Sequence, residues 1–119
     1  MLYKEFDFGG KTFKLRLGAR DIVKLEKKLG GNPMDIFMAV QRDQLPRIEA
    51  VILILQASMS KYHSNTSVDD VYDLYDDYIA SGGTYMDLIP VLLDVFKISG
   101  FFKKTDEDNN KKDSESKNI

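Results

Sequence analysis

The sequence of 119 residues contains no cysteine and a single histidine. Without cysteine, the chain forms no disulfide, no thiolate metal site and no cysteine nucleophile. A single imidazole excludes a metal site built from several histidines. The longest apolar run, Ala50 to Leu55, is far shorter than the ~20 residues that cross a bilayer. The first residues alternate in charge and lack the basic start and apolar stretch of a signal peptide, so we expect a cytoplasmic protein.

Charge is unevenly distributed along the chain. Apolar residues make up 43% and charged residues 30%, which is typical of a globular domain, and the formal net charge is −2. Residues 1–61 carry 11 Lys and Arg against 7 Asp and Glu, residues 62–102 carry one against 7, and residues 103–119 carry five of each. A half with a charge of +4 and a half with a charge of −6 therefore share one body.

The segment 103–119 has no apolar residue before its last position. It cannot bury enough surface to offset the entropy of ordering, so we expect a disordered polar tail. The rest of the chain, residues 1–102, is predicted to form a single folded domain.

Residues 2–17 are predicted to form a β-hairpin, because two alternating runs flank a Gly-Gly pair suited to a two-residue turn. With that turn, one face of the hairpin is apolar and the other carries complementary charges. The apolar face pairs Phe6 with Phe13 and Leu2 with Leu17, beside Leu15; the charged face pairs Tyr3 with Arg16, Glu5 with Lys14 and Asp7 with Thr12. A ribbon of two strands is barely stable alone, so its apolar face must lie on helices, while both strand edges stay unpaired.

Apolar spacing and turn signals predict four to five helices after the hairpin. The expected segments are 20–29, 33–42, 47–61, about 67–80, and a last helix that follows Thr84 and ends near 99–100. The third is apolar nearly all round, which marks the centre of the domain. Ser67 and Asp70 fit a capping box, and Pro90 either kinks the last helix or delays its start. The predicted fold is α+β, mostly α, with an N-terminal hairpin packed on these helices.

No pattern typical of catalysis is present. His63 lies beside Ser64 in a polar loop, and we interpret it as an exposed loop histidine because a nucleophilic triad needs a rigid pocket. The three Gly-Gly pairs are turn and helix-stop signals and match no phosphate-binding motif. The sequence therefore predicts a protein that is not an enzyme and binds no cofactor.

The fourth helix is acidic and rich in tyrosine. Its acidic face consists of Asp69, Asp73, Asp76 and Asp77. Divalent cations prefer oxygens supplied by a loop, and no such motif occurs, so this is a solvated face or a docking surface for a basic partner. The expected buried stripe comprises Val68, Val71, Tyr75 and Tyr78 or Ile79. Tyr72 lies at its margin, where a tyrosine often serves an interface.

The first helix carries a small basic face, which consists of Arg20, Lys24, Lys27 and Lys28. The sequence pI of about 5.4 and the negative half disfavour nucleic-acid binding. Solvated surface is the simpler interpretation of this face. A regulatory adaptor that binds a host protein or nucleic acid through it is an alternative.

Four features follow one another over about residues 3–102. They are the short hairpin, the stretch GARDIVKLEKKLGGNPMDIF, the hydrophobic central helix, and SVDDVYDLYDDYIASGGTYMDLIPVLLDVFKISGFF. Together they resemble the tail assembly chaperones of long-tailed bacteriophages that infect Gram-positive bacteria. The main alternative within phage biology is a small head–tail connector or completion protein of the virion.

The resemblance implies a non-enzymatic protein of the host cytoplasm that binds the tape measure protein before the tail tube polymerises around it. It also implies self-association into rings or spirals, absence from the finished virion, and in many members a longer form made by ribosomal frameshifting. We expect Tyr72, Phe101 and Phe102 to contact this client, and both phenylalanines to be replaceable by serine without unfolding. The basic and acidic faces are expected to drive head-to-tail self-association, with hairpin edges adding hydrogen bonds between subunits.

Overall fold

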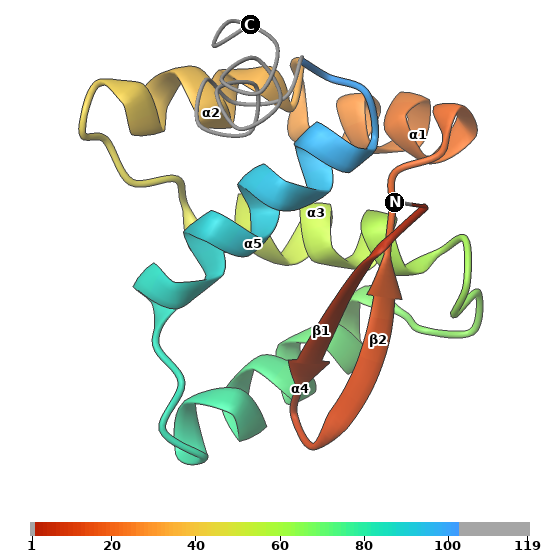
Figure 1. The fold of residues 1–119 in the computed structure, drawn as a ribbon, viewed down its shortest axis with the longest axis vertical. Helices are drawn as coiled ribbons and strands as arrows, with labels where there is room; N and C mark the ends of the chain where they lie inside the picture. The colour runs from red at the N-terminus through yellow and green to blue at the C-terminus, as the bar shows by residue number, and fades with distance from the viewer. Residues whose placement is uncertain (1, 103–119) are drawn as a thin grey trace, which may run out of the picture.

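The computed structural model describes residues 2–102 and confirms the predicted fold class, an N-terminal antiparallel hairpin followed by helices (Figure 1). The elements are β1 (Lys4–Phe8), β2 (Lys11–Leu15), α1 (Ala19–Leu29), α2 (Met34–Gln41), α3 (Ile48–Met59), α4 (Val68–Ala80) and α5 (Tyr85–Ile98). The predicted polar tail, residues 103–119, lies outside the described residues.

The register of the hairpin is the predicted one. Phe6 pairs with Phe13, and Phe8 pairs with Lys11 across a turn in which both glycines have positive φ. The predicted pair of Leu2 with Leu17 is wrong, because the strands begin at residue 4 and end at residue 15. Leu2 is 69% exposed while Leu17 is buried, so the apolar face does not extend to the N-terminus.

Two lysines, Lys4 and Lys11, lie on the same face of the hairpin as its phenylalanines. Lys4 is opposite Leu15, and its ammonium group lies 3.0 Å from a carboxylate oxygen of Asp94 in α5. Both side chains of this ion pair are partly exposed, so its contribution to stability is at most about 1 kcal/mol. The pair joins β1 to α5, while the aromatic residues of the hairpin supply the burial.

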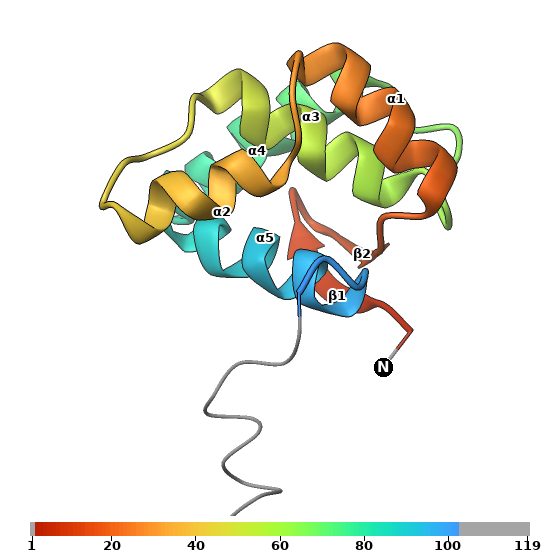
Figure 2. The same ribbon diagram turned by 90° about the horizontal axis from the view of Figure 1, so that it is seen from above.

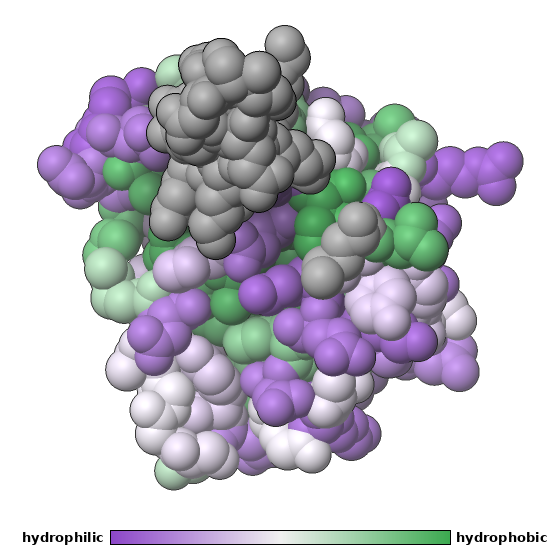
Figure 3. Space-filling model, in the orientation of Figure 1, coloured by the Kyte–Doolittle hydropathy of each residue, from purple (hydrophilic) through white to green (hydrophobic). Residues whose placement is uncertain are grey.

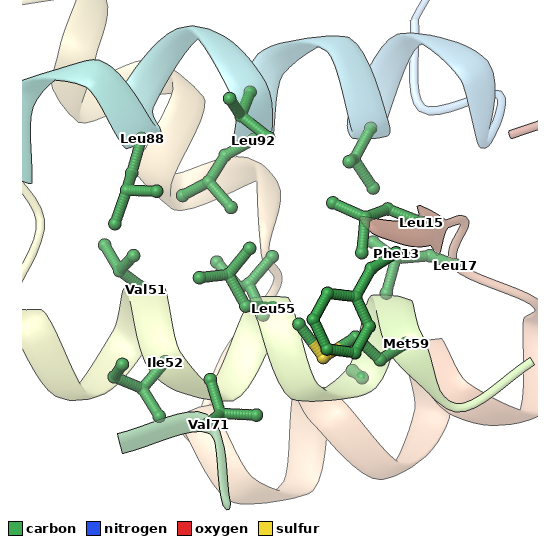
Figure 4. Close-up of a cluster of buried hydrophobic side chains, with 14 of the residues drawn as sticks. Phe13, Leu15, Leu17, Val51, Ile52, Leu55, Met59, Val71, Leu88 and Leu92 are labelled. Atoms are coloured by element: carbon green, nitrogen blue, oxygen red, sulfur yellow. The ribbon is translucent and has the colours of Figure 1, made fainter. Parts of the chain in front are cut away.

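Helix α3 lies at the centre of a single hydrophobic core (Figure 4). Its buried residues are Val51, Ile52, Ile54, Leu55, Ala57, Ser58 and Met59. Val51 faces Leu88 and Leu55 faces Leu92, both of α5, whereas Ile52 lies beside Val71 of α4 (Figure 4). Helix α3 is apolar nearly all round but has only 12 residues. No helix within residues 2–102 is long and apolar enough to cross a bilayer.

The predicted helix ends agree with the structure within about two residues. Ser67 caps α4 in a full capping box with Asp70, and Gly30 ends α1 in the left-handed conformation at φ 74°. The open question at Pro90 is partly answered, because α5 begins at Tyr85 and contains Pro90 in its interior. Pro90 therefore does not delay the start of the helix.

The turn of the hairpin lies directly against α4. A Cβ atom added to Gly9 would lie 2.7 Å from the Leu74 side chain and 3.0 Å from the Leu74 backbone. Gly10 also has a positive φ, but a Cβ atom there would have no neighbour within 4 Å. The two glycines therefore share a conformational requirement and differ in the space around them.

We predict that Gly9→Ala destabilises the protein by about 1–3 kcal/mol more than Gly10→Ala, because only Gly9 lies against a backbone that cannot move aside. Urea unfolding of both variants measures the difference, and Gly10→Ala controls for the cost of a positive φ. Equal stability of the two variants would show that the turn and α4 are not in contact in solution.

Candidate functional site

The single imidazole has a structural contact. His63 is half-buried, its Nε2 accepts a hydrogen bond from the backbone N–H of Lys14 at 3.0 Å, and its ring meets Phe13 edge-on. The interpretation of His63 as an exposed loop histidine is therefore wrong. Because Nε2 is the acceptor, the neutral ring carries its proton on Nδ1. Within residues 2–102, no group of three or more acidic or histidine side chains is placed to hold a metal ion.

The outer edge of β2 is covered by the end of α3 and the segment that follows it. The backbone N–H of Arg16 donates to the carbonyl of Ser58, in addition to the Lys14 N–H that donates to His63. The Lys14 ammonium lies 5.0 Å from the centre of the Tyr3 ring. The expectation that both edges are open is therefore wrong for β2, because these donors already have acceptors and cannot pair with another subunit.

The acidic face of α4 is solvent-exposed at all four of its aspartates. Beside it, the hairpin and α4 enclose a cleft of about 420 Å³. The cleft is lined by Lys11, Phe13, Asn65, Thr66, Asp70, Asp73, Leu74 and Asp77. The Ser67 backbone N–H and hydroxyl hold the pKa of Asp70 below its usual value, which keeps this carboxylate charged in the capping box.

The four members of the basic face of α1 are also exposed. No residue of either charged face forms an ion pair with another residue in the described part of the chain. Helix α1 lies at the top of the molecule and α4 at the bottom in Figure 1. The two faces are thus separated along the molecule, and the structure does not bring the predicted acidic and basic residues together within one copy.

The buried side of α4 includes one residue that the prediction left out, Leu74. Val71 is buried and Tyr75 and Tyr78 are partly buried, as expected, but Ile79 is 41% exposed. Leu74 completes the stripe in its place, packed on the core near the hairpin turn. Tyr72 is 38% exposed, at the margin of this stripe.

Phe101 and Phe102 are half-buried side chains that pack on the core. The Phe101 ring lies 5.1 Å from that of Phe96 in α5, and the Phe102 ring stacks on that of Phe37 in α2 at 4.7 Å. Their aromatic faces are therefore engaged within the domain. Replacing them with serine would remove these contacts, which speaks against the expectation that they are dispensable for folding.

Four of the exposed apolar side chains lie in α2, in the connection between α2 and α3, at the start of α3 and at the start of α5. Met38, Leu45, Ile48 and Met86, which we call the apolar rim, are 49%, 57%, 48% and 56% exposed. Figure 3 shows hydrophobic surface at its left edge, where Figure 1 places the connection between α2 and α3. No pattern in the sequence singles out these four residues, because methionine, leucine and isoleucine in helical segments are usually buried.

Two hydrogen bonds hold together the segments that carry the apolar rim. The Gln44 N–H donates to the Ala39 carbonyl, which folds the connection back on α2. The Tyr85 hydroxyl donates to the Pro46 carbonyl, which joins the same connection to the start of α5. Burial raises the pKa of Tyr85 above its ordinary value, with a smaller effect of Tyr75, so the phenol remains a donor.

We predict that His63→Ala lowers the free energy of unfolding by about 1 kcal/mol, because the Lys14 N–H loses its acceptor. Amide hydrogen exchange should become faster at Lys14. Ser64→Ala, at the exposed neighbouring position, serves as the control and should leave both quantities unchanged. An unchanged Lys14 exchange rate in His63→Ala would contradict the contact.

Comparison with known proteins found no matching curated protein and no matching solved structure. One protein family matches nearly the whole chain, over residues 2–119. With its two-stranded hairpin, its central apolar helix α3 and its separated charged faces, the chain belongs to DUF6096, a family of unknown function.

Proposed function

We propose that the protein is a non-enzymatic tail assembly chaperone of a long-tailed phage or prophage. In this role it binds the tape measure protein in the host cytoplasm, associates with copies of itself during tail assembly, and leaves before the virion is complete. The order of sequence features over residues 3–102 supports the assignment by resemblance. The observation that carries it is the apolar rim, exposed beside the apolar helix α2.

The apolar rim suits a transient helical partner. Helix α2 is mostly apolar, yet none of its residues is buried. Contiguous exposed apolar surface on a small domain is typical of a binding site, and methionine adapts its shape to different partners. A tape measure protein is a long chain of helices whose apolar faces need cover until the tail tube surrounds them. The rim offers such cover to one helix at a time.

The charged faces support self-association. An exposed basic face at one end of the molecule and an exposed acidic face at the other favour contact between the head of one copy and the tail of the next. A contact of this kind uses two different surfaces, so it propagates into a ring or a helix. Copies arranged in this way would repeat the apolar rim along a long client.

We predict that co-expression with this protein keeps a helical segment of the tape measure protein soluble, and that Ile48→Ser with Met86→Ser greatly reduces the yield of the soluble complex. Both side chains are about half exposed, so their loss costs little stability. Val23→Ser in α1, at 50% exposure and outside the rim, is the matched control.

Equal loss of the complex in the Val23→Ser control would contradict a specific role of the rim. Full recovery of the complex with the double variant would contradict it as well. Detection of the protein in purified virions, at the copy number of a structural component, would overturn the chaperone assignment in favour of a connector or completion protein.

We predict that assemblies of the protein dissociate as salt rises from 0.1 M to 1 M, because the Debye length falls from ~10 Å to ~3 Å. Sedimentation velocity measures the mass distribution at both concentrations. Lys24→Glu with Lys28→Glu, and separately Asp73→Lys with Asp77→Lys, should each give monomers. A mixture of the two variants should associate again, because each retains the face that the other needs and the two reversed faces also attract each other. A mass distribution unaffected by salt and by both substitutions would rule out an electrostatic contact.

A further inference from the structure

Helix α2 is weakly held by the rest of the domain. Every other helix and strand packs along at least one neighbour, whereas α2 has no extensive contact with any element. It has eight residues and none is buried; Ile36 and Phe37 are its side chains that pack against the core. A helix this short is not stable by itself, so it persists only through these few contacts. Figures 1 and 2 show it at the periphery of the molecule.

The chain is anchored on both sides of α2. Pro33 and Pro46 are buried, and the Pro46 carbonyl accepts the hydrogen bond from Tyr85. Between these anchors, residues 41–45 are all exposed, and Asp43 has a positive φ of 58°. The segment from Pro33 to Pro46 is therefore a strap fixed at its two ends, and its middle can leave the core without unfolding α1 or α3.

An aromatic contact closes the strap. Phe101 lies on Phe96, and its backbone N–H donates to the Phe96 carbonyl, which fixes the chain after α5. The next residue, Phe102, stacks on Phe37. This stack joins α2 to the last described residue of the chain. Such a stack contributes about 0.5–1.5 kcal/mol beyond the burial of its surface. A competing helix that makes similar contacts can supply this amount.

We propose that α2 is a displaceable helix that occupies the groove for the client, and that a client helix takes its place. The proposal rests on the proposed function, because it describes how that client binds. The expected client resembles α2, which now fills this site. Helix α2 is a short apolar helix that packs an adjacent aliphatic and aromatic pair, Ile36 and Phe37, against the core. The apolar rim borders the opening, so the client contacts it first and then exchanges with α2.

Hydrogen exchange with and without the tape measure segment tests the displacement. Amides of α2 should exchange faster in the complex than in the free protein, while amides of α5 should exchange more slowly. A client that docks on the outside of α2 would instead slow the exchange of α2, and that result would overturn the proposal. In the free protein, Phe102→Ala should speed exchange in α2 and leave α3 unchanged. Unchanged exchange in α2 would remove the aromatic closure from the proposal.

A covalent tether separates this proposal from the proposed function. The chain has no cysteine, so Phe37→Cys with Phe102→Cys gives two unique thiols that a short bismaleimide can bridge. The bridged protein should lose client binding at least tenfold. The same double variant, blocked with a monofunctional maleimide, should bind the client. Equal binding of the bridged and blocked forms would overturn displacement and leave the chaperone function standing, whereas no binding by the wild-type protein would overturn the chaperone function itself.

Discussion

The fold depends on the need to cover most of α3. This helix of 12 residues is apolar nearly all round and seven of its residues are buried, so the neighbouring elements must each contribute a face to it. The hairpin, α1, α4 and α5 all do so, and together they bury Leu55 and its neighbours completely. Helix α2 is not among these elements, and it has no extensive contact with any helix or strand.

Much of the fold was predictable because its signals are local. The turn at Gly9 and Gly10 sets the register of the hairpin, and the side chain of Ser67 starts α4 wherever that helix lies. Errors occurred where tertiary packing decides. Leu74 is partly buried while Ile79 is exposed, because the hairpin turn lies against Leu74. The contact of His63 with Lys14 joins residues 49 apart in the chain, and no spacing within either segment indicates it.

Some of the candidate surfaces could be predicted from the sequence and others could not. Charge patterning alone predicted the exposed acidic and basic faces, because aspartate and lysine without partners remain in water. The apolar rim was not predictable, since methionine, leucine and isoleucine in amphipathic segments usually belong to the core. Phe101 and Phe102 were expected to contact a client for their aromatic character, yet both rings find partners within the domain. Only the position of α2 in the fold shows that Phe102 is engaged within the domain while the residues of the apolar rim are exposed.

The stacking of Phe102 on Phe37 also determines where the chain leaves the domain. The last described residue, Phe102, therefore lies beside α2. For recombinant work the practical consequence is that an affinity tag or fluorescent fusion belongs ahead of β1, where it stays clear of the junction between α2 and α5.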